Sequence, residues 1–418
     1  MTVTGRQIEP IAVIGAGVIG CAIAWKLCQQ GLPVLLVDRS DPATAGASYG
    51  NAGHIATEQV EPLPSLGLLL GFWRELFALG GPLDIPLRRL APLSPWIAGF
   101  VAAAFRQRSH TRYLAPLVAR ATESLDRLLG EIGRRDLLRR HGHYCLWLGE
   151  RSQLKAQAQM RKMARLEVAI RPAPAGLVRE IAAAAGSRDG AGVWFPDTAH
   201  VLDPSAVAGA MAAAALQSGA RYHRAEVREV RPEGEQIEIQ TDTQRLRTAR
   251  AIICAGAWSR PLLALFGLNA PLEAERGYHI ELPGHAPLAD APLVYPQHSL
   301  IVTPLAGRLR ATSYLELAGL EAPPDARKPA RLRSRLRTLG YACPLGGPGW
   351  MGPRPTLPDY LPGIGRAQAC PNLLYAVGHQ HLGLTLAAAT AELIADLVAG
   401  RPPPIDTRAF DLARFGRP

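Results

Sequence analysis

Three glycines near the N-terminus, Gly15, Gly17 and Gly20, stand at a spacing suited to holding phosphate oxygens. Gly15 permits a tight turn, Gly17 lets the backbone approach a pyrophosphate, and Gly20 lets a helix pack closely on a strand. The next acidic side chain, Asp38, follows 18 residues after Gly20. Its carboxylate can accept hydrogen bonds from the hydroxyls of an adenosine ribose. These residues predict a dinucleotide site.

The elements around the glycines are those that such a site needs. Residues 10–14 are apolar and predict a buried parallel strand, which is followed by the glycine turn and a helix that ends at Gly31. Residues 33–38 predict a second apolar strand that ends in Asp38. An acidic residue at that strand end argues against NADP and fits either NAD or FAD.

Two later segments are suited to return to the same nucleotide. The first is a short alternating strand, RAEVREV, followed by a strand that ends in ICAGAWS (residues 253–259). The second, residues 372–400, predicts a strand through Val377, a glycine-bearing loop and a helix from about Leu384 to Gly400. A helix start beside a flavin can stabilise negative charge on the reduced ring. The order of these segments favours FAD over NAD.

Composition bounds the class of protein. The chain has 418 residues, 48% of them hydrophobic and 19% charged, which excludes a disordered chain and predicts a globular protein of two to three domains. The net charge of +11 comes from arginines scattered without long runs, which is typical of compositional bias and not of a nucleic-acid arm. Six cysteines show neither a CxxC pair nor zinc-type spacing, so neither a disulfide nor a metal site is predicted.

Targeting signals are weak. The first ten residues lack the pattern of a signal peptide, and no apolar run reaches the length of a membrane span, so a cytoplasmic location is expected. Residues 66–79, LGLLLGFWRELFAL, carry large apolar groups around most of a helix. We interpret this stretch as buried packing, with peripheral contact on the cytoplasmic face of the inner membrane as the alternative.

Five sequence blocks follow one another along nearly the whole chain: VIGAGVIG with Asp38, residues 47–54 (ASYGNAGH), ICAGAWS, GPRP (residues 352–355) with Asp359 and residues 363–365 (GIG), and GHQHLGLT (residues 378–385). In this order they resemble the D-amino-acid oxidase-like family of FAD-dependent amine oxidoreductases. The similarity points in particular to bacterial D-amino-acid dehydrogenases and D-hydroxyproline dehydrogenases, flavoproteins of amino-acid catabolism.

The resemblance implies a noncovalent FAD, since no cysteine stands at a position that would attach it. It implies that the loop around Ser48 lies along the flavin and that the backbone of Val227 contacts adenine. The predicted cofactor-binding residues are Gly15, Ala16, Gly17, Val18, Ile19, Gly20, Asp38, Arg39, Ser48, Asn51, Ala52, Gly53, His54, Val227, Cys254, Ala255, Gly256, Trp258, Gly352, Arg354, Gly378, Gly383, Leu384 and Thr385.

The resemblance also implies a fold of the α/β plus α+β class. Residues 8–60, 197–262 and 352–400 are expected to form a discontinuous FAD-binding domain of the Rossmann type. Residues 61–196 and 263–351 are expected to form a substrate-binding domain with a mixed sheet, and residues 401–418 a C-terminal tail. The alternating pattern of segments such as ERGYHIEL is typical of strands in a sheet with one open face.

An amino-acid substrate needs its carboxylate held so that Cα–H points at flavin N5, and a planar arginine does this with two parallel hydrogen bonds. Arg354 matches the family's carboxylate-binding arginine, with Arg276 as a weaker alternative. Tyr278 is predicted to line the pocket and to bond to the carboxylate or cap the substrate. The expected reaction is hydride transfer from Cα to flavin N5, which leaves an imino acid.

The substrate amine must be neutral when the hydride leaves, and a histidine can help its proton to depart. His54 directly follows the flavin loop and is the first candidate, ahead of His379 and His381. Packing of His54 against the flavin for shape is the alternative. The predicted substrate-binding residues are Arg354, Tyr278, His54 and His379, and no histidine is predicted to be a metal ligand.

Substrate and electron acceptor stay open at this point. The leading substrates are cis-4-hydroxy-D-proline and D-proline, with electrons passed to a quinone or another carrier. The alternative within enzymes is an oxygen-using oxidase of the glycine or sarcosine oxidase type. A remote alternative is a nucleotide-binding or nucleic-acid-binding protein without turnover. The oligomeric state cannot be read from the sequence.

Overall fold

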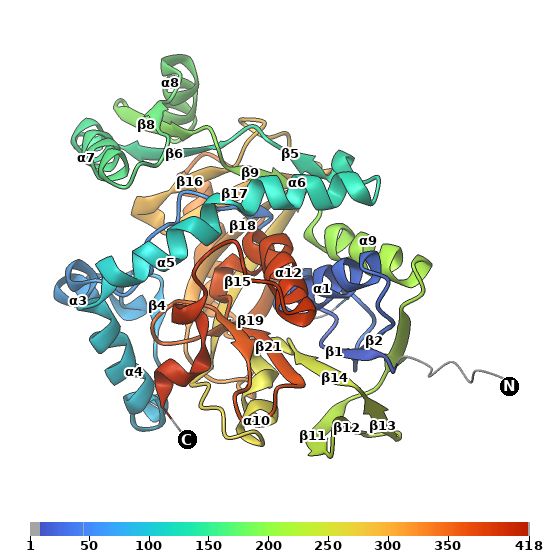
Figure 1. Cartoon of the computed structure of the whole chain (residues 1–418). Coiled ribbons are helices and arrows are strands. Elements are labelled where there is room, and N and C mark those ends of the chain that lie inside the picture. Colours follow the sequence, from blue (N-terminus) through green and yellow to red (C-terminus); the bar gives the residue numbers. More distant parts are fainter. Residues whose placement is uncertain (1–8, 45, 417–418) are drawn as a thin grey trace, which may run out of the picture.

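The structure is a computed structural model that describes residues 9–44 and 46–416. The expectation about a leader peptide, the first residue of the predicted segment 8–60, and the last two residues of the predicted tail lie outside the described residues. The chain forms two large sheets with helices around them (Figure 1).

The first sheet has six strands in the order β10 (Arg221–Arg224), β2 (Val34–Asp38), β1 (Ile11–Ile14), β14 (Arg250–Ile253), β21 (Leu373–Val377) and β20 (Gly363–Arg366). All neighbours pair in parallel except β20, which is antiparallel to β21. Strand β1 is buried along its whole length, as expected for a parallel strand covered on both faces.

Helices cover one face of this sheet and a smaller sheet covers the other. Helix α1 (Val18–Gln29) packs between α9 (Pro204–Gln217) and α12 (Gly383–Ala399), as Figure 1 shows. The opposite face packs against α10 (Ser259–Ala264) and a three-stranded sheet, which consists of β11 (Val227–Glu233), β12 (Gln236–Thr241) and β13 (Arg245–Thr248). This arrangement places the turn after β1 at the carboxyl edge of the sheet, where ligands bind in α/β folds.

The second sheet is mixed and larger. Its strands, in the order in which they pair, are β19 (Trp350–Thr356), β15 (Glu273–Pro283), β18 (Arg308–Glu316), β17 (Leu300–Leu305), β16 (Leu293–Tyr295), β6 (His143–Leu148), β8 (Gly190–Phe195) and β7 (Arg171–Pro172), with β4 (Leu83–Asp84) beside β18. Helices α7 (Ser152–Arg165) and α8 (Ala175–Ala184) pack on β8, and α11 (Arg327–Thr338) packs on β15.

The remaining segments join the two sheets. Helices α3 (Leu66–Gly71) and α4 (Leu90–Ala104) lie at the left of Figure 1, and α5 (Gln107–Ala119) and α6 (Ala121–Glu131) run from there across the molecule, past α12. Strand β9 (Ala199–Val201) pairs with both β3 (His54–Ile55) and β5 (Leu138–Arg139), and the short helix α2 (Gly46–Tyr49) precedes β3.

Two segments pack with a different domain from the one to which the prediction assigned them. Residues 352–356, assigned to the nucleotide segment 352–400, belong to β19 and pair with β15 of the large sheet. Helices α5 and α6, assigned to the substrate segment 61–196, pack on α12 and share the core of the first sheet. The prediction divided the chain at its motifs, whereas hydrogen bonding and packing continue across them.

The apolar stretch 66–79 is not interior, so the expectation of buried packing is wrong. Helix α3 is only six residues long and gives way to 3₁₀ turns, so the stretch does not form one long helix with a buried face. Leu70 is 84% exposed and Trp73 50%, while Phe77 is buried.

One helical stretch in the described residues, Gln380–Ala399, is long and apolar enough to cross a membrane by length and composition. Of its most apolar window, 72% is buried inside the protein. This stretch contains α12, which packs against α1 and α6, so its hydropathy is that of a core helix.

Candidate functional site

The glycine turn has the geometry that its sequence predicts. Gly15 has φ +112°, and a Cβ there would stand 2.4 Å from the carbonyl oxygen of Cys254. A Cβ on Gly20 would stand 1.8 Å from the Gly15 carbonyl oxygen, so Gly20 permits close packing of helix on strand. Ser48 Oγ accepts a hydrogen bond from the Val18 N–H at 3.0 Å, which ties the flavin loop to the start of α1.

A cleft of about 390 Å³ runs along the carboxyl edge of the first sheet. Asp38 lies there with its carboxylate accepting hydrogen bonds from the N–H groups of Ala16 (2.7 Å) and Ser40 (2.9 Å). The cleft is lined by most of the predicted binding residues: Gly15, Ala16, Gly17, Val18, Ile19, Asp38, Arg39, Ser48, Asn51, Ala52, Val227, Cys254, Ala255, Gly256, Trp258, Gly352, Arg354, His379, Gly383 and Leu384.

Five predicted cofactor contacts do not line the cleft: His54 lines only the second cavity described below, and the other four have structural roles. Gly20 and Gly378 sit where a Cβ would collide with neighbouring atoms. Gly53 accepts a backbone hydrogen bond from Val201, and Thr385 Oγ1 accepts one from the Ala56 N–H. Trp350 was not predicted and does line the cleft, where its ring covers Gly50 and Gly352. No local sequence signal marks that tryptophan as a wall of the cleft.

The hydrogen-bond donors that line the cleft suit a flavin dinucleotide. The N-terminal ends of α1 and α12 both meet it, and helix N-termini favour negative charge. Gln380, just before α12, lines the cleft, and its Nε2 is buried without a hydrogen-bond partner in the part of the chain that the structure describes. Such an orphan donor is what an acceptor atom of a bound cofactor would satisfy.

A second cavity of about 780 Å³ adjoins the cleft. It is lined from the loop after β3, from β6, and from β16, β17 and β18 of the large sheet. Five residues line both spaces, and they mark the junction: Asn51, Ala52, Thr312, Arg354 and His381.

Arg354 is held at this junction by a fixed set of contacts. Its guanidinium lies across Gly277 of β15, where a Cβ would stand 2.1 Å from Nη2. Nη1 donates to Glu275 Oε1 at 2.9 Å and to the Tyr314 carbonyl at 3.3 Å. Glu275 is buried and is itself oriented by the hydroxyl of Tyr360 at 2.8 Å. The guanidinium is therefore anchored through Nη1, and Arg354 lines both spaces.

Tyr278 lies away from both cavities, which corrects its predicted role in the substrate pocket. Its hydroxyl donates to Glu316 Oε2 at 2.6 Å and accepts from the Asp325 N–H at 3.0 Å. Burial raises the pKa of this hydroxyl, with Glu316 adding to the shift. Arg276, the alternative carboxylate ligand, is fully buried in an ion pair with Glu316. Both side chains stabilise the far face of the large sheet.

Tyr314 lines the second cavity, for which Tyr278 was predicted, although its ring packs 6.5 Å from that of Tyr278 in one apolar cluster. The pairing of β15 with β18 shifts register between Arg276 and Tyr278, which leaves two residues of β18, Tyr314 and Leu315, opposite Gly277. Tyr314 has φ +69°, an uncommon conformation for an aromatic residue. Such a bulge redirects a side chain. Tyr314 lines the second cavity, and its buried hydroxyl has no partner among the residues described.

The histidines at the site are buried, which lowers their basicity. Burial lowers the pKa of His54 to about 3, with His200 and His381 adding to the shift. Burial likewise lowers the pKa of His379 to about 3 and that of His381 to about 4. His54 lines only the second cavity, not the cleft. Near pH 7 these imidazoles are neutral and weak proton acceptors, so the predicted proton-accepting role of His54 is disfavoured.

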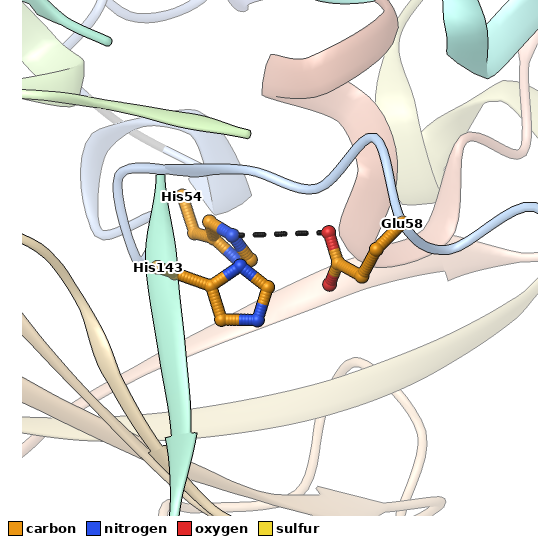
Figure 2. A group of neighbouring side chains, drawn as sticks. All are labelled: His54, Glu58 and His143. Carbon is orange, nitrogen blue, oxygen red and sulfur yellow. Dashed lines mark ion pairs between the residues drawn. The ribbon is translucent and has the colours of Figure 1, made fainter. Parts of the chain in front are cut away.

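Glu58 and His143 are functional candidates that the sequence did not reveal. Figure 2 shows both beside His54, with Glu58 Oε2 3.9 Å from His54 Nε2. Burial raises the pKa of Glu58 to about 7. Neither residue belongs to a sequence motif: Glu58 follows His54 by four residues, but His143 comes from a distant strand, β6, and reaches them only in the folded chain.

Comparisons with known proteins agree with this geometry. The model of the family described as FAD dependent oxidoreductase (DAO) matches residues 10–397. A D-amino-acid oxidase of Bradyrhizobium diazoefficiens is 30% identical over 415 residues, which cover 97% of this chain and 98% of that protein. A D-amino acid dehydrogenase of Paramagnetospirillum magneticum is 28% identical and is covered to 98%.

Solved structures show the same fold. Glycine oxidase from Geobacillus kaustophilus has a TM-score of 0.75 at 21% identity, over 97% of this chain and 98% of that one. L-Proline dehydrogenase from P. horikoshii has a TM-score of 0.73 at 16% identity, over 98% of each chain.

Proposed function

The chain belongs to the family of FAD-dependent oxidoreductases, and on that premise we propose that it oxidises a D-amino acid to the corresponding imino acid. The enzyme is an amino-acid oxidoreductase with FAD as its cofactor. We propose cis-4-hydroxy-D-proline and D-proline as the leading substrates. FAD, when bound, supplies the acceptor for the hydride that leaves the substrate Cα.

The position of Arg354 carries this proposal. Its guanidinium stands where the cleft meets the second cavity, and its Nη1 is fixed by Glu275. A substrate carboxylate bound by the remaining donors would place Cα at the junction, next to the cleft. Fixing the carboxylate in this way removes rotational freedom from the reacting carbon. A positioning arginine lowers the barrier mainly through this loss of freedom before the reaction.

Among the residues that the structure describes, no strong base lies at this junction, since burial keeps the nearby histidines neutral. We therefore propose that the substrate amine loses its proton to water before or during binding. On this proposal kcat/KM rises with pH until the amine of the free substrate is deprotonated.

The electron acceptor is proposed to be a quinone or another carrier, with oxygen as the alternative. The D-amino-acid oxidase and the D-amino acid dehydrogenase are nearly equal in identity to this chain, so they favour neither. An exposed apolar surface favours the carrier. It consists of Leu66, Leu70, Phe72, Trp73, Leu79, Leu87 and Leu90.

This apolar surface supports peripheral contact with a membrane, from which a quinone could be drawn. Arg74 and Arg88 flank its residues in sequence, and the net charge of the chain is +11, which suits an anionic lipid surface. Co-sedimentation with phosphatidylglycerol vesicles tests the contact. Binding that Leu70→Asp together with Trp73→Asp abolishes supports it, and the absence of binding at low salt contradicts it.

The proposed reaction is tested by the visible spectrum of the holoenzyme. Anaerobic addition of cis-4-hydroxy-D-proline or D-proline is expected to bleach the flavin band, whereas the L-isomers leave it unchanged. Oxygen or a soluble quinone is then admitted, and the faster reoxidation identifies the acceptor class. A flavin band that no D-amino acid bleaches contradicts the substrate class.

A further inference from the structure

Three polar side chains form one wall of the second cavity. His54 comes from β3, Glu58 from the loop that follows, and His143 from the start of β6; we call them the polar wall. Each offers a nitrogen or oxygen atom, and these atoms lie within 4.8 Å of one another. Figure 2 shows the three side chains gathered around a common space, with the rings of His54 and His143 edge to face at 4.6 Å.

The polar wall has unsatisfied hydrogen-bonding capacity. His54 Nε2 and Glu58 Oε2 are buried, and neither has a hydrogen-bond partner within the described ranges 9–44 and 46–416. A buried polar atom left without a partner costs about 1–3 kcal/mol. The side chains of His54 and Glu58 are only 7% and 11% exposed, so bulk water does not compensate for them.

Other buried carboxylates of this protein are neutralised by a cation. Glu275 is paired with Arg354. Glu316 is paired with Arg276 and with Lys328, whose Nζ also contacts Asp84 and fills the space between those carboxylates. Glu58 instead faces two imidazoles that burial keeps neutral. The polar wall therefore differs from a structural ion pair, and a ligand group is the partner that it lacks.

The chemistry of the wall calls for a hydrogen-bond donor. Thr198 Oγ1 donates to the Phe195 carbonyl at 3.1 Å, so it accepts from Nδ1–H of His143 at 3.0 Å. That tautomer leaves His143 Nε2 with a lone pair. Together with the carboxylate of Glu58, the wall offers mainly acceptors. Its partner is a group that can donate, such as a hydroxyl or an ammonium.

The spacing of the polar wall is wider than that of a closed zinc site. Zinc bonds of about 2.0–2.2 Å in tetrahedral geometry hold neighbouring ligand atoms about 3.3–3.5 Å apart. The 3.9 Å between His54 Nε2 and Glu58 Oε2 is wider. An atom bridging both by hydrogen bonds of about 2.8 Å fits the wider separation.

The position of the polar wall indicates which part of the substrate it contacts. His54, Glu58 and His143 line the second cavity but not the cleft, whereas Arg354 lines both. A substrate with its carboxylate on Arg354 and its Cα toward the cleft extends its other end into the second cavity. The polar wall therefore meets the side chain or ring substituent and not the reacting amine.

We propose that His54, Glu58 and His143 form a specificity site for a hydrogen-bond-donating group, a hydroxyl or an ammonium, at the end of the substrate farthest from its carboxylate. The inference rests on the proposed function and assigns the substrate class to amino acids with a polar far end. Glu58 accepts the donor hydrogen, and the two histidines position it.

The test compares substrates that differ only in the far group. The kcat/KM for anaerobic flavin reduction is measured for cis-4-hydroxy-D-proline against D-proline, and for D-lysine against D-norleucine. We expect the wild-type holoenzyme to prefer the polar member of one pair by at least about tenfold, because a site built for a donor rejects the analogue that lacks it. The pair that shows the preference distinguishes a hydroxyl from an ammonium.

Variants then assign the preference to the wall. Glu58→Gln is expected to reduce the ratio about tenfold with little change for the apolar member of the pair. Glu61→Gln is the matched control, because Glu61 lines the same cavity but is already paired with Lys162 at 2.6 Å. That variant is expected to keep the wild-type ratio.

Three outcomes would overturn the inference. One is a wild-type enzyme that reduces both members of each pair equally well, and this measurement does not depend on how the variants fold. Another is a ratio that Glu58→Gln leaves unchanged. The third is a stoichiometric metal in the purified holoenzyme that Glu58→Gln removes. Failure of every D-amino acid to bleach the flavin would instead contradict the proposed function itself.

Discussion

The cleft and the second cavity share Arg354 but are built in different ways. The cleft is formed mainly by backbone at the ends of neighbouring parallel strands, with glycines where the chain must pass close to another segment. The second cavity is formed by side chains from segments far apart in the sequence, including residues 54–63, 143–145 and 312–315. A local pattern can therefore encode the cleft, whereas the cavity exists only once strands from different regions have paired.

The largest effect is expected from a substitution that blocks the close approach of two backbone segments in the cleft. Gly15→Ala places a Cβ 2.4 Å from the Cys254 carbonyl in a conformation, φ +112°, that alanine avoids. The purified variant is expected to contain little or no FAD, measured as the ratio of flavin to protein absorbance. Gly31→Ala is the control, because Gly31 also has positive φ but a Cβ there meets no atom within 4 Å. Full flavin content in Gly15→Ala would contradict the backbone account of the cleft.

The next largest effect is expected at the junction of the two spaces. Arg354→Lys keeps a cation beside Glu275 but loses the planar fork that binds a carboxylate through two hydrogen bonds. We expect kcat/KM for the best D-amino acid to fall by about 10²–10³-fold, or roughly 3–4 kcal/mol of transition-state stabilisation. Flavin content is expected to stay at the wild-type level. A loss of less than about threefold would remove Arg354 from the role of carboxylate ligand.

The sequence predicted the cleft well because single residues carry its geometry. Gly15 and Asp38 fix a turn and a strand end within one strand–helix–strand unit, and the Gly352-Pro353-Arg354 block places the arginine by resemblance. The pocket was less predictable. Tyr278 and Tyr314 are both strand tyrosines whose rings pack in one apolar cluster, and only Tyr314, at the bulge in β18, also lines the cavity. Glu58 and Glu61 lie in one loop, and only the fold shows that Glu58 is buried beside His54 while Glu61 pairs with Lys162.

A third prediction concerns the cost of keeping Glu58 buried. Burial raises its pKa from the ordinary 4.5 to about 7, so the folded protein binds more protons than the unfolded chain between these values. The free energy of unfolding that this extra bound proton contributes is fully present below about pH 4.5 and is lost as pH rises through 7. Its total is about 3 kcal/mol. Glu58→Gln removes the titration, so the variant is expected to gain stability over the wild type as pH rises from 5 to 8.

Thermal unfolding of both holoenzymes across this pH range measures the difference. The gap between their Tm values is expected to widen by a few degrees toward pH 8. A gap that stays constant with pH would show that Glu58 titrates normally and is not desolvated. That result would contradict the description of the polar wall as buried. Glu61→Gln is expected to show no such trend, since Glu61 lies in an ion pair at the rim.

The smallest effects are expected from removing the hydroxyls of Tyr278 in β15 and Tyr314 at the bulge in β18. Tyr278→Phe removes the hydrogen bond to Glu316 and leaves the Asp325 N–H without its partner, and it is expected to cost about 1–2 kcal/mol of stability. Its kcat/KM is expected to stay near the wild-type value, because Tyr278 touches neither space. Tyr314→Phe removes a hydroxyl that has no partner in the described chain, so its stability is expected to change by less than about 0.5 kcal/mol. If the hydroxyl of Tyr314 contacts substrate, its loss changes KM and not Tm. The reverse result, a changed KM in Tyr278→Phe and a lowered Tm in Tyr314→Phe, would mean that the strand register, and with it the cavity wall, is other than described.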